Sequence, residues 1–542
     1  MTAHLDGRDA ERPVADRPGW GDLDPAVHER RWITLGVLCL SLLIIVMDNT
    51  ILNVAIPSLI RELDATNSQI QWIIDAYVLV FAGLLLTTGS LSDRFGRKGA
   101  LQIGIVLFSI GSVAAAVSTS ATQLIFTRAF MGIGGALIMP ATLSILTNVF
   151  RDPTERGRAI AVWAGFSGVG VAIGPMMGGF LLEHFSWHSV FWVNLPIGVA
   201  ALLAGIRYVP TSRDERTRPL DPFGAALSIV GLASLLFGII EGPVKGWTHA
   251  SVVIGFVVAV MSIVTFIWWE SHTPHPMLDI SVFRNPRFTA ASLTITFVFF
   301  ALLGSLFLMT QYWQLVHGYT PLRAGIRLLP HAATMMIVAP LSARAVERVG
   351  TKRVVVFGLG LMTTGIFLLS TIAPDTPYLI VISYFVVMAS GMGMTMAPAT
   401  ESVMGSLPRE QAGVGSAIND TTRQVGGALG VAIIGSIVSS MYAGRIGEAG
   451  DAFGLSSADT ATAQESLGAA QRIAGQLGSA AAGFFDAANR AFVDALSVGL
   501  RLSAVVIVGA AIGAWRYLPA RADSRRPVDD GAERIAMGAG DG

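Results

Sequence analysis

The sequence predicts an all-α polytopic membrane protein with fourteen transmembrane helices, and three features support this fold class. Of the 542 residues, 52% are apolar and only 14% are charged, against roughly 25% charged in soluble domains. The mean hydropathy is +0.60. Apolar runs long enough to cross a bilayer recur along the chain, and one charged loop between two of them returns later in a degraded form.

Fourteen runs reach the roughly 20 mostly apolar residues that a membrane-spanning helix needs. In chain order they are 33–58, 71–91, 99–118, 122–148, 158–182, 189–207, 222–241, 251–269, 288–310, 322–342, 353–372, 378–402, 412–440 and 498–517. The first run is too long for the apolar core of a signal peptide, so we expect it to remain in the membrane.

Lys and Arg fall unequally on the two sides of these spans. With residues 1–32 inside, the inner segments hold 27 of them and the outer segments six. Because basic residues accumulate on the cytoplasmic side, we expect both termini in the cytoplasm. The richness in Ala, Gly and Arg fits a bacterium with a high-GC genome, so we expect a multi-pass protein of the bacterial cytoplasmic (inner) membrane. Residues 441–497 are then one long outer segment. The pattern of residues 461–495 predicts one or two weakly amphipathic helices. Three interpretations of this segment stay open, namely a lid, a support on the lipid headgroups and a passive connector.

Composition and motifs argue against several other classes of protein. The 37 basic residues balance the 37 acidic ones, so no attraction to nucleic acid is expected. A single cysteine, Cys39, supplies neither a disulfide nor a metal cluster. The sequence has no HExxH motif and no P-loop. We therefore expect no ATP-driven pump, no enzyme, no catalytic or metal-binding residues and no cofactor.

Ionisable side chains inside a span are costly in a bilayer and are usually functional. Asp48 in the first span, Asp75 in the second and Arg128 in the fourth are expected roughly 8 to 13 Å below the outer surface. They come within reach of one another if these spans pack together. For Asp48 two interpretations stay open, namely proton exchange beside Arg128 or a fixed structural ion pair. Asp75 is the weaker of the two proposed proton carriers.

A third acid, Asp420, lies in the thirteenth predicted span. Arg423 follows three residues later and therefore shares its helical face, where the two side chains are expected to pair. Self-pairing is the favoured interpretation for Asp420, and proton exchange is the alternative.

Glycines at every fourth position line one face of the fifth span. They are Gly170, Gly174 and Gly178, with Pro175 and Gly179 beside them. Small residues let a neighbouring helix approach closely, and a proline permits a bend. The pattern predicts either ordinary tight packing or a hinge with a sealed interface, which suits an antiporter because an antiporter must not leak ions.

The charged loop after the second span predicts a conformational latch. Its residues are Gly89, Asp93, Arg94, Gly96, Arg97 and Lys98, and the degraded copy covers 340–353. Gly96 permits a sharp turn, Asp93 is suited to cap a facing helix through its dipole, and the basic residues meet the inner leaflet. Many secondary transporters are built from two such repeated halves.

Together these residues resemble the major facilitator superfamily, and within it the fourteen-span drug:proton antiporter group. The similar segments are Gly89-x-Leu-x-Asp93-Arg94-x-Gly96-Arg97-Lys98, Leu124-x-x-x-Arg128-x-x-x-Gly132, Gly170-x-x-x-Gly174-Pro175-x-x-Gly178-Gly179, Asp48-Asn-Thr-Ile-Leu-Asn53-Val-Ala-Ile-Pro57 and Trp192-x-Asn194-x-Pro196-Ile-Gly198. Two positions depart from the family pattern. His188 replaces an expected arginine, and Asp420 replaces an uncharged residue, which implies an extra protonation site or a preference for cations.

The resemblance implies the major facilitator fold, with two six-helix bundles and two inserted central helices. The expected segments are a tail at 1–32, a first bundle at 33–207, a linker with the inserted helices at 208–287, a second bundle at 288–517 that includes the extracellular loop 441–497, and a tail at 518–542. Arg128 is linked to proton transfer by the same likeness, and Asp93 is expected to latch against the start of the thirteenth span, near Ala412.

The function implied is proton-coupled export of small amphipathic drugs or toxic compounds by alternating access, through a monomer in the lipid bilayer. The alternative is a dedicated exporter of one physiological molecule, such as a lipid, a siderophore or a self-made antibiotic. An apolar cavity with few polar anchors is expected for the substrate. The residues suggested for its lining are Asn53, Tyr77, Met139, Tyr312, Trp313 and Asn419. For each of them a place in the core or facing the lipid is the plainer interpretation.

Overall fold

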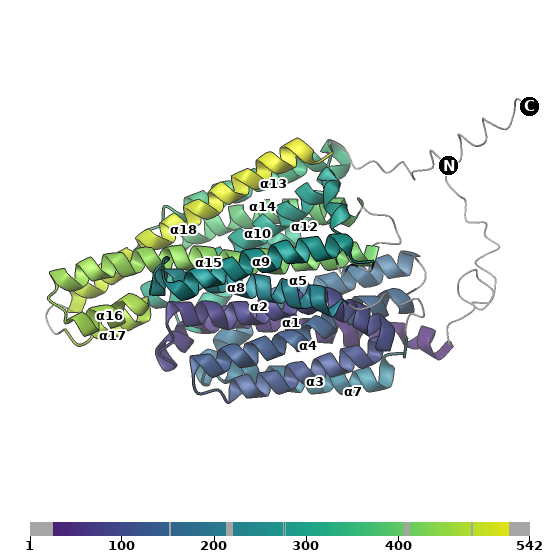
Figure 1. The fold of residues 1–542 in the computed structure, drawn as a ribbon, viewed down its shortest axis with the longest axis horizontal. Coiled ribbons are helices and arrows are strands. Elements are labelled where there is room, and N and C mark those ends of the chain that lie inside the picture. Colours follow the sequence, from purple (N-terminus) through teal and green to yellow (C-terminus); the bar gives the residue numbers. More distant parts are fainter. Residues whose placement is uncertain are drawn as a thin grey trace, which may run out of the picture.

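The computed structural model is built of helices that run side by side along its long axis (Figure 1). It describes residues 25–150, 153–212, 221–274, 276, 278–404, 406, 412–477 and 481–519. The first helix begins and the last helix ends at the same end of the molecule, which we call the terminal end. Two short helices, α16 and α17, lie at the opposite end (Figure 1), which we call the loop end.

The first half of the chain forms one bundle. Its helices are α1 (Pro25–Glu62), α2 (Asn67–Phe95), α3 (Arg97–Ala116), α4 (Ala121–Val149), α5 (Pro153–His184), α6 (Ser189–Trp192) and α7 (Asn194–Tyr208). Helix α4 packs between α2 and α3, and α1 packs against α5 and α7. The short α6 and the longer α7 together occupy the predicted span 189–207, with a break at Val193.

The second half forms the other bundle. Its elements are α10 (Pro286–Gln311), the π-helical turn η4 (Tyr312–Val316), α11 (Pro321–Arg327), α12 (Leu329–Val349), α13 (Thr351–Leu369), α14 (Tyr378–Met404), α15 (Ala412–Ala452), α16 (Ser457–Glu465), α17 (Leu467–Ala474) and α18 (Ala481–Tyr517). Helix α14 packs on α12 and α13, while α10, α15 and α18 pack on one another. The two bundles touch mainly where α2 meets α15 and where α5 meets α11.

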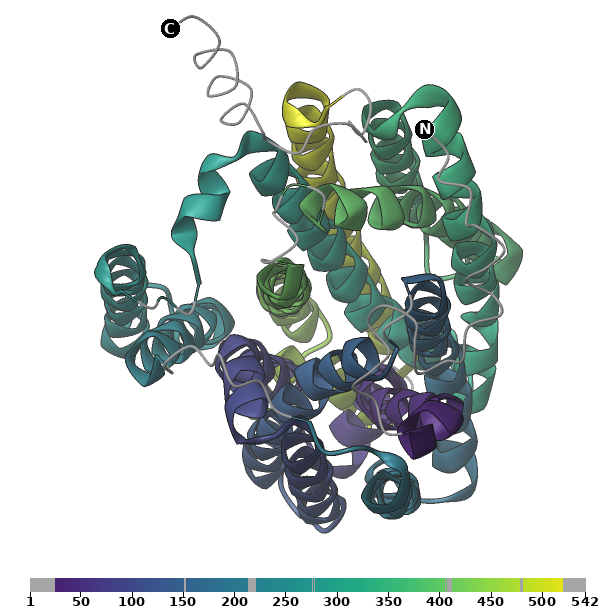
Figure 2. The ribbon, with the colours of Figure 1, turned by 90° about the vertical axis from the view of Figure 1, so that its right-hand side faces the viewer.

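The inserted helices are α8 (Pro222–Lys245) and α9 (Ala250–His272), followed by the short 3₁₀ helix η3 (Ile280–Arg284). They are central in the sequence but peripheral in space, because they form a pair at the side of the two bundles (Figure 2). Helix α8 contacts α2 and α15. At its end, Glu241 accepts hydrogen bonds from Ser68 Oγ (2.7 Å) and Trp72 Nε1 (3.3 Å) of α2. This contact ties the inserted pair to the first bundle.

Thirteen of the described helical segments are long and apolar enough to cross a membrane. The one predicted span without such a segment, the fifth at 158–182, coincides with α5, a helix of 32 residues in which several side chains lie outside the described part. Every predicted span thus has a helix or a pair of helices at its position. The all-α prediction and the two-bundle fold class are confirmed.

The internal repeat in the sequence corresponds to equivalent packing in the two bundles. Gly96 between α2 and α3, and Gly350 between α12 and α13, both have positive φ, at 109° and 90°, which favours glycine. Close glycine contacts recur as well. A Cβ on Gly104 of α3 would lie 2.9 Å from the carbonyl oxygen of Gly134 in α4, and one on Gly358 of α13 would lie 2.8 Å from that of Gly391 in α14.

Residues 441–497 are mostly helical. Helix α15 continues to Ala452 and α18 begins at Ala481, so both extend well past the spans predicted at 412–440 and 498–517. Helices α16 and α17 fold back beneath these extensions at the loop end (Figure 1). The segment is rich in alanine, the residue with the highest helix propensity, which accounts for the continuation of both helices beyond their apolar parts.

Candidate functional site

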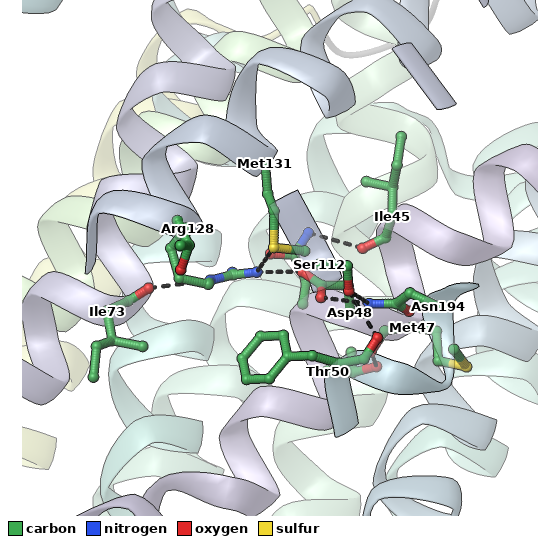
Figure 3. Close-up of polar contacts among 12 residues, drawn as sticks. Ile45, Met47, Asp48, Thr50, Ile73, Ser112, Arg128, Met131 and Asn194 are labelled. Carbon is green, nitrogen blue, oxygen red and sulfur yellow. Dashed lines mark hydrogen bonds and ion pairs between the residues drawn. The ribbon is translucent and has the colours of Figure 1, made fainter. Parts of the chain in front are cut away.

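A buried ion pair joins α1 to α4. The Asp48 side chain on α1 and the Arg128 side chain on α4 are each 1% exposed, and Arg128 Nη1 contacts Asp48 Oδ2 (Figure 3). Removing one partner from a pair this deeply buried would leave an uncompensated charge, which costs about 3 to 5 kcal/mol. The two side chains, which their similar depths placed within reach of one another, are thus paired in the structure. Loss of either one is expected to be costly.

Glycines on α4 bring Arg128 close to α2. A Cβ on Gly132 would lie 2.7 Å from the carbonyl oxygen of Tyr77, and one on Gly135 would lie 2.7 Å from the Tyr77 hydroxyl. Any larger residue would push the helices apart. At this short separation Arg128 Nε donates to the carbonyl oxygen of Ile73 at 3.2 Å, and the guanidinium lies 4.4 Å from the Tyr77 ring centre. Helix α2 thus orients Arg128 toward Asp48.

The other carboxylate oxygen of Asp48 faces a polar network on α3 and α7. Asn194 Nδ2 donates to Asp48 Oδ1 at 3.0 Å and to Ser112 Oγ at 3.1 Å. Ser112 in turn donates to the carbonyl oxygen of Phe191 at 2.7 Å. Sequence reasoning gave no role to either residue. Asn194 stood within a recognised motif, whereas a lone serine in an apolar span gave no signal.

Asp75 does not join this network, and the expectation that it lies beside Asp48 and Arg128 is wrong. On α2 it faces away from Ile73 and Tyr77, because it lies two residues from each. It shares its helix face with Gln71, which meets Gly435 of α15, and with Val78, which lines a small cavity together with residues of α8 and α15. Its side chain is fully buried, and neither oxygen has a hydrogen-bond partner among the described residues.

Asp420 pairs with its own neighbour, as its spacing predicted. Asp420 Oδ1 and Arg423 Nη1 are 3.9 Å apart on α15, with side chains 17% and 31% exposed. Arg423 Nη2 also donates to Thr400 Oγ1 of α14 at 3.2 Å. This pair lies in the second bundle, whereas Asp48 and Arg128 lie in the first.

The glycine face of α5 packs directly on the helix that carries Asp48. A Cβ on Gly170 would lie 2.9 Å from Val46, one on Gly174 would lie 1.9 Å from Thr50 Oγ1, and one on Gly178 would lie 2.6 Å from Ile51. These contacts leave no room for a side chain at the three positions. Helices α1 and α5 are therefore in close contact on both sides of Asp48 along the chain.

The neighbouring residues Pro175 and Gly179 face the second bundle. A Cβ on Gly179 would lie 2.4 Å from Leu322 Cα of α11, and one on Gly325 of α11 would lie 2.2 Å from the carbonyl oxygen of Pro175. Two backbones from different bundles therefore touch at this point. The predicted close packing is present, and it serves two interfaces, one inside the first bundle and one between the bundles.

The charged loop meets the end of α7. Lys98 Nζ donates to the carbonyl oxygen of Ile206 at 2.9 Å. The backbone N–H of Arg97 donates to the carbonyl oxygen of Ser212 at 3.0 Å. A Cβ on Gly89 would lie 3.7 Å from Pro140 of α4. The side chains of Asp93, Arg94 and Ala412 lie outside the described residues, and so does the contact expected between Asp93 and the start of α15.

The residues suggested for a substrate cavity are dispersed over both bundles. Tyr77, Tyr312 and Trp313 are fully buried, with Tyr312 bonded to the carbonyl oxygen of Ala373 and Trp313 packed on Phe385. Asn53 is half-buried and donates to the carbonyl oxygen of Asn49. Among the remaining two, Met139 is half-buried and Asn419 is buried. In this conformation the three aromatic residues are core residues.

Comparison with known proteins agrees with this architecture. Residues 38–431 match the family model of the Major Facilitator Superfamily, and the chain belongs to this family. It is 34% identical over 483 residues to the multidrug efflux pump LfrA of Mycolicibacterium smegmatis, and the aligned region covers 89% of this chain and 95% of LfrA. It is 32% identical over 490 residues to the methyl viologen resistance protein SmvA of Salmonella typhimurium, covering 90% and 98%.

A third relative is the tetracenomycin C resistance and export protein of Streptomyces glaucescens, 32% identical over 436 residues and covering 80% of this chain and 79% of that one. Among solved structures, a bacterial homologue of the human lysosomal transporter Spinster superposes with a TM-score of 0.63 at 18% identity, covering 91% and 97%. At that identity the structural likeness supports the fold alone.

Proposed function

We propose that this protein is a secondary active exporter that exchanges amphipathic drugs or toxic compounds for protons across the cytoplasmic membrane. One observation carries the proposal, namely the fully buried Asp48–Arg128 pair in a fold of two repeated bundles. An acid at such a position is costly to charge without its partner, so gain of a proton and separation from Arg128 are linked. The names of the related efflux and resistance proteins support drug-like substrates.

The packing around Asp48 can couple a change in its charge to a relative movement of the two bundles. A proton on Asp48 removes the attraction for Arg128 and loosens α1 from α4. Helix α1 is in close contact with the glycine face of α5, and α5 touches α11 of the second bundle through Gly179. A shift of α1 therefore changes one of the contacts that hold the two bundles together at the loop end.

The distribution of Lys and Arg orients this cycle in the membrane. It supports an orientation with the terminal end in the cytoplasm and the loop end outside. In the described conformation the bundles are joined at the loop end through α5 and α11, which is the arrangement of a transporter closed to the outside. Protonation of Asp48 from outside, after the bundles part at that end, releases the substrate. Loss of the proton to the cytoplasm restores the ion pair and favours substrate capture.

A second candidate function is export of one dedicated compound. Several relatives bear the name of a single antibiotic, among them the tetracenomycin C and methylenomycin A resistance proteins. The same proton chemistry would serve either function. Breadth of substrate distinguishes them, and it is measured directly by comparing chemically unrelated drugs.

The test is drug-driven proton release from proteoliposomes that contain the purified protein, with Asp48→Asn beside the wild type. We expect proton release on addition of ethidium or methyl viologen, and its loss in Asp48→Asn. Asp75→Asn and Asp420→Asn, which replace two further acids within the spans, should retain it. Full proton release by Asp48→Asn would reject Asp48 as the coupling acid. A response to only one compound would favour the dedicated exporter.

A further inference from the structure

Asn194 is the first residue of α7, directly after the break at Val193 that separates α6 from α7. Its side chain is fully buried and points at Asp48 (Figure 3). The ion pair explains why Arg128 is present, but it does not explain an amide on the other side of the same carboxylate. The hydrogen bonds around Asn194 determine how this amide is oriented.

The orientation of the amide follows from a chain of donors. Ser112 uses its only hydroxyl hydrogen to bond the carbonyl oxygen of Phe191 at 2.7 Å, so it offers Asn194 only a lone pair. An N–H group must meet that lone pair, and Nδ2 does so at 3.1 Å. The second hydrogen of Nδ2 then points at Asp48 Oδ1, 3.0 Å away. Ser112 and the Phe191 carbonyl thus hold Asn194 as a donor toward the carboxylate.

This donor makes the two oxygens of Asp48 chemically different. Oδ1 faces an N–H group and has no room for a hydrogen of its own in that direction. Oδ2 faces Arg128, which can withdraw and still keep its bond to the Ile73 carbonyl. A proton that arrives at Asp48 is therefore placed on Oδ2, where it takes the position of the Arg128 hydrogen.

Resting on the proton-exchange function proposed above, we infer that Asn194 is a positioning residue that directs the proton to Asp48 Oδ2 and so couples protonation to release of Arg128. In the step itself, a proton adds to Oδ2 and the hydrogen bond from Arg128 Nη1 breaks. Arg128 keeps its positive charge and its bond to Ile73. Asn194 gains and loses no proton.

Among the described residues, few other charged or titratable groups lie near Asp48. From α4 it faces Arg128, and from α2 the Tyr77 hydroxyl lies close enough to interact with it. Helices α3, α5 and α7 present Ser112, glycines and Asn194, which are uncharged. Arg472 of α17 reaches the far end of α1, where it bonds the Ile60 carbonyl, and pairs with Asp64 just beyond that helix. A change in the pH dependence of Asp48 chemistry on mutation of Asn194 would thus reflect the hydrogen bond between them.

The test is infrared titration of the purified full-length protein, following the carbonyl band of protonated Asp48, which is assigned by its loss in Asp48→Asn. Asn194→Ala removes a donor to the carboxylate, so the pH midpoint of the band should rise by about one unit. Ser112→Ala frees the amide to turn and should raise the midpoint by less. Ser41→Ala is the matched control, because Ser41 is a buried serine on α1 whose hydroxyl bonds the Val37 carbonyl of its own helix. The pH midpoint of the band in this variant should equal that of the wild type.

A second variant distinguishes loss of the hydrogen bond from misfolding of the protein. Asn194→Asp keeps the shape of the side chain but replaces the donor with an acceptor, so the proton can lie between two carboxyl groups, away from Arg128. We expect this variant to bind drug yet release fewer protons per drug in proteoliposomes. An unchanged midpoint in Asn194→Ala, with proton release still lost in Asp48→Asn, would overturn the inference and leave the transport function standing. Intact proton release in Asp48→Asn would instead reject the function on which the inference rests.

Discussion

At the scale of single residues, Asp48 and Arg128 form an ion pair in the interior of the first bundle. Both are almost completely removed from solvent, and each depends on the other because an isolated charge is costly in a bilayer. The two side chains are held by different kinds of contact. Arg128 is held by a backbone carbonyl and a ring, at Ile73 and Tyr77, whereas Asp48 is held by Arg128 and Asn194.

Replacing Arg128 with methionine, of similar length but uncharged, should destabilise the protein by about 3 to 5 kcal/mol, since Asp48 is left buried and unpaired. The double variant Asp48→Asn/Arg128→Met should recover most of that loss but release no protons on drug addition. Thermal unfolding in detergent measures the stability, and proteoliposomes measure the release. Equal unfolding temperatures for the single and double variants would show that the pair carries no such coupling.

At the scale of helices, the two faces of α5 explain why its glycines and proline occur together. One face allows α1 to approach, and the other brings Gly179 against the α11 backbone. A helix that packs closely on two neighbours, one on each face, needs small residues on both sides. The pattern at every fourth position signalled the first face, but only the structure shows the second.

We expect Gly179→Val to separate α5 from α11 and to open the loop end. The added side chain would start 2.4 Å from Leu322 Cα, and neither backbone can yield without moving a helix. Labelling of Asn53→Cys by a membrane-impermeant thiol reagent from outside should rise several-fold. The lone native cysteine, Cys39, is buried. Gly360→Val is the matched control, because a Cβ there meets nothing within 4 Å, and labelling in that variant should stay at the starting level.

At the scale of the whole molecule, α17 of the second bundle contacts α1 of the first at the loop end. Arg472 donates to the Ile60 carbonyl at 3.3 Å and pairs with Asp64 at 2.8 Å. The Asp64 side chain is 79% exposed, and pairs this exposed contribute less than about 1 kcal/mol. The contact marks where the bundles meet, but this ion pair alone does not keep them closed.

A reversible cross-link at this contact tests alternating access. A Cβ on Gly468 of α17 would lie 3.8 Å from the Ile60 Cβ, which matches disulfide geometry. Ile60→Cys/Gly468→Cys should therefore form a disulfide that stops drug transport, and a reducing agent should restore it. A matched bridge inside the first bundle, Ser109→Cys/Gly198→Cys at 3.7 Å, should leave transport unchanged. Transport through the oxidised Ile60/Gly468 variant would mean that the bundles do not part at this point.

The sequence by itself determined the order of the spans, the glycine face of α5 and the presence of the intramembrane charges Asp48 and Arg128. Those features depend on hydrophobicity, on helical periodicity and on the cost of charge in a bilayer, all of which are local to a segment. Only the tertiary structure decided that Asp75 turns toward α15, that Asn194 and Ser112 complete the surroundings of Asp48, and that α8 and α9 lie at the periphery. The rotation of a helix about its axis, and the choice of its neighbours, result from contacts between residues far apart in the chain, so no single segment specifies them.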